Sequence, residues 1–204
     1  MDEFHKALGD ISSIRRQVAR TTEFRGYGPA TLAVTGFFAL LSAGMQDRWI
    51  PQPAKHISEY VGLWCSTALV SAVLAGIQMY TRSRRIHSGL SDEMIHMAVE
   101  QFLPAVGAGL LLTVVLLRTV PNLAWMLPGL WQVIFSLGIF ASCRFLPRPI
   151  FLAAAWYLLA GLLCIGLGGN RALSPWAMAI PFGAGQMLVA GILLFCAKES
   201  GDED

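Results

Sequence analysis

Six long apolar stretches, separated by short charged joints, dominate the pattern of the chain. On hydropathy they cover residues 29–46, 60–80, 102–120, 124–143, 149–168 and 175–196. Each is close to the ~20 residues that an α-helix needs to cross a ~30 Å hydrocarbon core. Between Gln101 and Lys198 there is no Asp or Glu, and ionised side chains are costly inside hydrocarbon. The pattern predicts an all-α integral membrane protein in which residues 29–196 form a single bundle of six transmembrane helices.

The first 28 residues carry an apolar stripe of their own. Its members recur at intervals of three or four residues, the spacing of one helix face: Phe4, Leu8, Ile11, Ile14 and Val18. Three arginines lie largely off that stripe, namely Arg15, Arg16 and Arg20. We expect a cytoplasmic amphipathic helix and a joint over residues 1–28, contacting the membrane surface, the bundle or a partner helix. Residues 197–204 are expected to be an acidic cytoplasmic tail.

Lysine and arginine are unevenly divided between the two sides of this predicted bundle. When successive joints are assigned to alternate sides, one side carries 11 of them and the other carries 4. Because basic joints stay in the cytoplasm, both termini are predicted to be cytoplasmic. Four tryptophans fall near the predicted outer interface, where aromatic rings anchor spans: Trp49, Trp64, Trp125 and Trp176.

The joint after the second span begins with Arg82, Arg84 and Arg85, within reach of lipid phosphates or of a cytoplasmic partner. Further along, Glu93 and His96 have the spacing of half a di-metal carboxylate site. Such a site needs a second copy and more acids inside the bundle, which the sequence does not supply. We therefore expect a solvated helix face there and no metal.

Composition excludes several classes of protein. The chain has 204 residues, of which 55% are hydrophobic and only 14% charged, against about 25% charged in a soluble domain. The net charge of +2, with basic residues scattered among the joints, argues against nucleic acid. The four cysteines form no CxxC pair, and none of the four histidines lies in a span to ligate haem. No cofactor and no catalytic residue is predicted, and enzymatic activity is disfavoured.

A few polar side chains fall within the predicted spans. Gln132 and Ser136 share one face of the fourth span at i, i+4, and Gln186 lies near the middle of the sixth. These three are the candidate ligand-binding residues, lining a small polar cavity between spans four and six; the alternative is that they form interhelical hydrogen bonds. Pro128 and Pro181 are expected to lie deep enough to bend these two spans.

Small residues at four-residue spacing predict close helix contacts in several spans, for example Thr35, Ala39 and Ala43 in the first. In the second span two such stripes run side by side: Thr67, Ser71 and Ala75, and next to them Ala68, Ala72 and Gly76. Packing within one chain is the default interpretation, and a homodimer face is the alternative.

Three stretches are similar to those of uncharacterised bacterial inner-membrane proteins of about this length. They are residues 24–29 (FRGYGP), residues 84–94 (RRIHSGLSDEM) and the region from Met126 to Pro147. The resemblance covers most of the chain and implies a six-helix protein of the bacterial inner membrane. It implies no activity, ligand or catalytic residue.

Two functions follow as hypotheses. The first is a non-enzymatic sensor or accessory subunit that presents a cytoplasmic docking face to a protein partner, since the irregular charged sequence lies on the inner side. The second is a permease or channel for a neutral or hydrophobic small molecule, in which Pro128 and Pro181 interrupt helices around Gln132 and Gln186.

Overall fold

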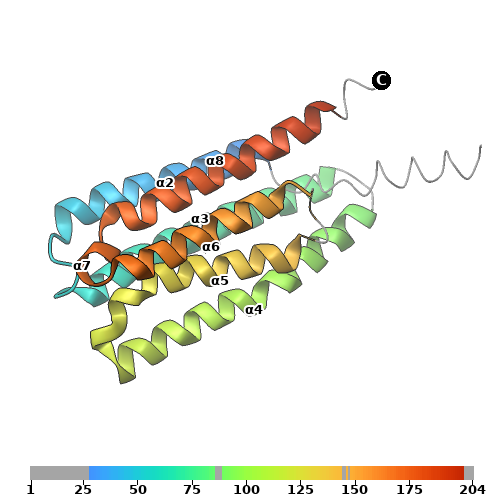
Figure 1. The fold of residues 1–204 in the computed structure, drawn as a ribbon. Helices are drawn as coiled ribbons and strands as arrows, with labels where there is room; N and C mark the ends of the chain where they lie inside the picture. The colour runs from blue at the N-terminus through green and yellow to red at the C-terminus, as the bar shows by residue number, and fades with distance from the viewer. Residues whose placement is uncertain (1–27, 86–88, 144–145, 147, 200–204) are drawn as a thin grey trace, which may run out of the picture.

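The computed structural model describes residues 28–85, 89–143, 146 and 148–199, and every regular element in these ranges is a helix. The elements are α2 (Pro29–Trp49), α3 (Ile57–Arg85), α4 (Gly89–Thr119), the 3₁₀ helix η1 (Pro121–Met126), α5 (Leu127–Ser142), α6 (Ile150–Leu167), the short α7 (Gly169–Ala172) and α8 (Pro175–Glu199). The long helices run side by side as one elongated bundle (Figure 1). The predictions for residues 1–27 and 200–204 lie outside the described residues.

Six of these segments are long and apolar enough to cross a membrane: Pro29–Trp49, Ile57–Thr81, Val99–Thr119, Pro121–Ser142, Ile150–Leu167 and Gly169–Phe195. They coincide with the six predicted spans, so the sequence prediction of a six-helix all-α architecture is confirmed at this level. Two helices are longer than expected. Because α3 continues to Arg85 and α4 begins at Gly89, most of the predicted inner joint is helical.

Prolines mark where several helices begin. Pro29 and Pro175 are the first residues of α2 and α8, where a missing N–H costs little. Pro128 is the second residue of α5 and follows η1, so it lies inside the apolar segment Pro121–Ser142, close to the point where the helix changes from 3₁₀ to α. Pro181 does lie inside a helix, and α8 is continuous through it.

The first and last long helices of the chain lie side by side. α2 packs along α8, α8 contacts α6, α6 packs along α5, and α4 packs against α5. The remaining long helix, α3, packs mainly on α2 and makes few contacts with α4 (Figure 1). The apolar segments of α3 and α4 are also the least buried of the six, so both helices lie at the margin of the bundle.

Glycines allow the closest helix contacts. A Cβ on Gly129 would lie 2.7 Å from the carbonyl oxygen of Gly161, and a Cβ on Gly161 would lie 2.7 Å from the carbonyl oxygen of Gly129. The backbones of α5 and α6 therefore touch at this crossing. In the α2–α8 pair, a Cβ on Gly36 would lie 3.3 Å from the carbonyl oxygen of Gly183. The predicted small stripe of the first span faces inward here, since Thr35, Ala39 and Ala43 are buried.

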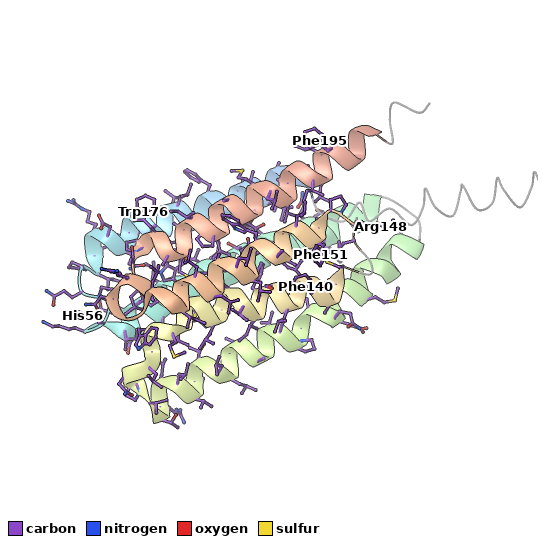
Figure 2. All side chains as sticks on the ribbon, in the orientation of Figure 1. His56, Phe140, Arg148, Phe151, Trp176 and Phe195 are labelled. Carbon is purple, nitrogen blue, oxygen red and sulfur yellow. The ribbon has the colours of Figure 1, made fainter. Side chains whose placement is uncertain are left out.

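The outer surface of the bundle is apolar. Large side chains project outward from every long helix, among them Leu111 at 69% exposed, Leu163 at 67% and Phe195 at 75% (Phe195 is labelled in Figure 2). Monomers that fold in water rarely expose apolar patches larger than a few hundred Å². The interior, by contrast, contains buried amide, hydroxyl and indole groups.

The α5–α6 crossing predicts different outcomes for two glycine substitutions on one helix. Gly161→Ala should lower the free energy of unfolding by about 1–3 kcal/mol, because the new methyl group meets backbone atoms. Gly166→Ala is the matched control: nothing lies within 4 Å of its added Cβ, so better helix propensity should leave it neutral or stabilised. Thermal unfolding of the two purified variants in detergent measures this, and equal effects would contradict the close crossing.

Candidate functional site

Gln132 of α5 is fully buried and links its helix to the start of α8. Its Nε2 donates to the carbonyl oxygen of Ala177 at 2.9 Å and lies 3.7 Å from the sulfur of Met178. In an uninterrupted helix the carbonyl of Ala177 would accept from the N–H of residue 181. Pro181 has no N–H, so the Gln132 amide supplies the missing donor. This pairing explains why α8 tolerates a proline in its interior.

Four buried side-chain atoms in the described ranges have no hydrogen-bond partner: Tyr60 Oη, Gln132 Oε1, Ser136 Oγ and Tyr157 Oη. Gln132, Ser136 and Tyr157 are all 0% exposed. Gln132 and Ser136 lie one turn apart on α5, as the sequence predicted, and Tyr157 lies on the adjacent α6. Leaving such a group unpaired costs about 1–3 kcal/mol, so each needs an explanation.

An aromatic cluster fixes the position of Tyr157. Its ring centroid lies 4.8 Å from that of Phe135 and 5.2 Å from that of Phe182, and those two rings are 5.4 Å apart. The phenol end of Tyr157 lies against Gly185 of α8, where an added Cβ would collide with the ring and its oxygen. Tyr157 therefore extends from α6 across to α8. We call the region where Gln132, Ser136 and Tyr157 lie the α5–α6–α8 seam.

Gln186, the third predicted site residue, has a different neighbour. It is half-buried at the α2–α8 contact, where its Cβ lies 3.1 Å from the position that a Cβ on Gly36 would take. The structure thus places Gln132 and Ser136 together on α5 and puts Gln186 against α2. Tyr157, which sequence reasoning did not select, contributes to the seam instead. Its only sequence signal is a hydroxyl within an otherwise apolar span.

A second buried polar group lies at the end of the bundle where α7 and the α2–α3 joint are found. The Nε1 of Trp64 donates to Gln46 Oε1 at 2.8 Å, and Gln46 Nε2 donates to the carbonyl oxygen of Leu173 at 2.8 Å. Trp64, predicted to lie near the outer interface, is only 4% exposed and holds α3 to α2. Trp49 and Trp176, at 65% and 60%, are exposed as expected for interface residues.

Sequence reasoning also missed Gln46. A signal was available, because Gln46 follows Ser42 by four residues and therefore shares a helix face with the buried small-residue stripe of α2. A polar side chain on such a face needs an internal partner. Gln46 finds two, one on α3 and one at the start of the sixth span.

Further hydrogen bonds connect other helix pairs. Ser42 and Thr67 join α2 to α3 at 2.6 Å, Trp131 donates to Thr113 of α4 at 2.8 Å, and Trp156 donates to the carbonyl oxygen of Pro181 at 2.9 Å. At the opposite end of the bundle, the backbone N–H of Gly28 donates to Gln78 at 3.2 Å. The buried polar groups thus lie at helix contacts.

The buried polar side chains in the described part of the bundle are of uncharged types. Among the residues that the structure describes, the buried polar side chains are amides, hydroxyls, indoles and a thiol, and no three His, Cys, Asp or Glu side chains gather to hold a metal. The predicted surface contacts Arg15, Arg16 and Arg20 lie outside the described residues, and only the helical backbone is described at Arg82, Arg84 and Arg85. Comparison of the chain with protein families, curated proteins and solved structures finds no match.

The pairing of Gln132 with Ala177 predicts a rescue. Gln132→Leu should lower the free energy of unfolding by about 1–3 kcal/mol, because the Ala177 carbonyl loses its donor in an apolar interior. Adding Pro181→Ala restores a backbone N–H for that carbonyl, so the double variant should recover most of the loss. Thermal unfolding measures both steps. If Pro181→Ala lowers stability equally with and without Gln132, the amide does not serve the proline.

Proposed function

We propose that this chain is a multi-pass protein of the bacterial inner membrane, with six spans and both termini in the cytoplasm. The apolar outer surface supports insertion into a bilayer, because Leu111, Leu163 and Phe195 would otherwise face water. The division of basic residues supports the orientation. The resemblance of residues 24–29, 84–94 and 126–147 to uncharacterised inner-membrane proteins supports the bacterial origin.

Within that membrane the protein acts as a non-enzymatic sensor or accessory subunit with a cytoplasmic docking face. The observation that carries this proposal is that interior polar side chains form hydrogen bonds between spans. Four residues do so, namely Gln46, Gln132, Trp156 and Thr67. No ionisable acid–base pair is found among the described buried side chains. The bundle is therefore a fixed frame, and the charged sequence available for contacts is that of residues 1–28 and the joint containing Arg82, Arg84 and Arg85.

The permease hypothesis receives less support. It required Pro128 and Pro181 to interrupt helices and free backbone carbonyls for a solute. Pro128 stands at the start of α5, and the carbonyl released by Pro181 accepts from Gln132. Gln186 is turned to the α2–α8 contact instead of toward Gln132.

Thiol labelling tests the orientation. His56 and Arg148 lie at opposite ends of the bundle (Figure 2), so a variant without native cysteines is given one thiol, as Lys55→Cys beside His56 or as Arg148→Cys. A membrane-impermeant maleimide should label the first in cells whose outer membrane alone is permeabilised, and the second only after the inner membrane is opened. The reverse pattern, or a monomer that stays in the aqueous fraction, would refute the proposal.

A matched pair of variants tests the docking face. Leu8→Asp with Ile11→Asp places charge on the apolar stripe of residues 1–28, whereas Ser12→Asp with Ser13→Asp adds the same charge beside it. In a mild-detergent pull-down from native membranes, the first pair should abolish a stoichiometric protein partner and leave the thermal midpoint unchanged. The second pair should retain the partner. A partner retained by both pairs, or found to be a second copy of the chain held through the spans, would contradict the cytoplasmic docking face.

A further inference from the structure

A hydrogen bond joins the start of α2 to the last part of α3. The backbone N–H of Gly28 donates to Gln78 Oε1 at 3.2 Å, and a Cβ added to Gly28 would collide with the amide of Gln78. α3 continues for about two more turns beyond this contact, to Arg85. Arg82 and Arg85 follow Gln78 by four and seven residues, so their backbone positions share its helix face. We call the region of Gly28, Gln78, Arg82 and Arg85 the α2–α3 corner.

Positive charge gathers at the α2–α3 corner. The N-terminus of a helix is the positive end of its macrodipole, which an anion or an acidic side chain offsets. The first turn of α2 contains no acidic residue. Asp47 is the one acid of α2 and Glu59 the one acid of α3, and both lie toward the other end of their helices. Two arginines are therefore placed beside a helix start that itself favours an anion.

The other helices supply little negative charge to this corner. α8, which packs along α2, ends with Lys198 and Glu199, whose formal charges cancel. The acids of α4 are Asp92, Glu93 and Glu100, but α4 makes few contacts with α3. Within the described helices, the charge of the corner is thus left for an anion from outside the chain to offset.

Along the span that leads to this corner, α3 has an uncovered face. The stripe that contains Thr67 is turned to α2, whereas the adjacent stripe of Ala68, Ala72 and Gly76 is exposed. Nothing lies within 4 Å of a Cβ added to Gly76. Small residues allow a neighbouring chain to approach the helix backbone closely. Gly76 precedes Arg82 by six residues, about 9 Å of helix rise, so the apolar face and the charged corner are neighbours.

We propose that the α2–α3 corner binds the phosphate of an anionic phospholipid, one acyl chain of which lies along Ala68, Ala72 and Gly76. Arg82 and Arg85 supply the positive charge. A phospholipid has both parts in the right order, since its phosphate adjoins an apolar chain that covers half of the membrane core, about 15 Å. The inference rests on the membrane insertion proposed above and adds a ligand to it.

Charge argues against a second copy of the chain as the occupant of this face. Two copies in one membrane share an orientation, so a contact through α3 would bring Arg82 and Arg85 of both copies to the same level. Like charges at that distance repel. A phospholipid reverses the sign of this interaction.

Native mass spectrometry of the full chain in detergent tests the headgroup. Wild type should retain one phosphatidylglycerol in preference to phosphatidylcholine. Arg82→Gln with Arg85→Gln should weaken phosphatidylglycerol binding by about 25-fold, because each arginine near a membrane surface contributes about fivefold. The matched control, Arg144→Gln with Arg148→Gln, removes the same charge from another joint and should leave the affinity unchanged. Equal losses in the two pairs, equal retention of the two lipids, or a dimer that excludes lipid would overturn the proposal.

A second pair of variants tests the acyl chain. Ala72→Phe fills the exposed small-residue face and should weaken phosphatidylglycerol binding. Val70→Phe is the control, because Val70 is also exposed but lies about 200° away around the helix. Equal effects of the two substitutions would overturn the placement of the chain.

Inorganic phosphate separates a lipid site from a site for a soluble anion. Phosphatidylglycerol should raise the thermal midpoint of wild type, and inorganic phosphate at the same concentration should not. An equal rise with both would overturn the assignment to a lipid. Because these measurements use purified protein, they do not depend on orientation. If lipid selectivity is absent while Lys55→Cys is labelled from outside, the lipid site alone is refuted and the proposed membrane topology stands.

Discussion

The need to satisfy polar groups away from water governs how this bundle is assembled. A helix satisfies its own backbone hydrogen bonds, whereas a buried amide or indole side chain depends on partners from other helices. A hydroxyl can instead bond to a carbonyl of its own helix, as Thr35 and Ser142 do. Gln46 has two partners on other segments, joining α3 and the start of the sixth span through its two amide atoms. Gln132 goes further and repairs a backbone gap, since it donates to the carbonyl that Pro181 leaves without an N–H. Polar residues in the interior are thus few, and most of them act between spans.

Hydropathy alone was enough to find the spans, because about 20 uncharged apolar residues leave few alternatives to a membrane-length helix. The ends of the helices were harder to predict. Nothing in composition separates the 3₁₀ helix Pro121–Met126 from the α-helix after it, so the sequence pattern did not predict that the fourth span begins with a 3₁₀ segment. The alternation of α-helical faces placed Gln132 and Ser136 together correctly, since residues four apart share a face.

The sequence pattern did not reveal which side chains of neighbouring helices contact one another. A tryptophan near the end of a span is typical of an interface anchor, so only the hydrogen bond from Trp64 on α3 to Gln46 on α2 reveals its buried role. Gln186 resembles Gln132 in type and depth, yet the rotation of α8 turns it toward Gly36. Tyr157 was not predicted as a site residue, because a single hydroxyl in an apolar span does not indicate which side chains surround it. Helix rotation and partner choice depend on the packing of the whole bundle.

Close packing is distributed unevenly among the helices. Glycines let α5 touch α6 at Gly129 and Gly161, and let α2 approach α8 at Gly36 and Gly183. The pairs formed by α3 and α4 with their neighbours lack such backbone contacts in the described glycines, and these two helices carry the most exposed apolar surface. A four-helix centre is therefore joined by two looser peripheral helices.

The pairing of α2 with α8 joins the first span to the sixth. Under the proposed membrane topology, α2 would enter the bilayer during synthesis before α8, which packs along it, has been translated. The face of α2 that α8 covers would stay without its partner helix until then. The pairing of α2 with α8 is thus a late, long-range event, and a chain stalled before Pro175 would leave that face of α2 uncovered.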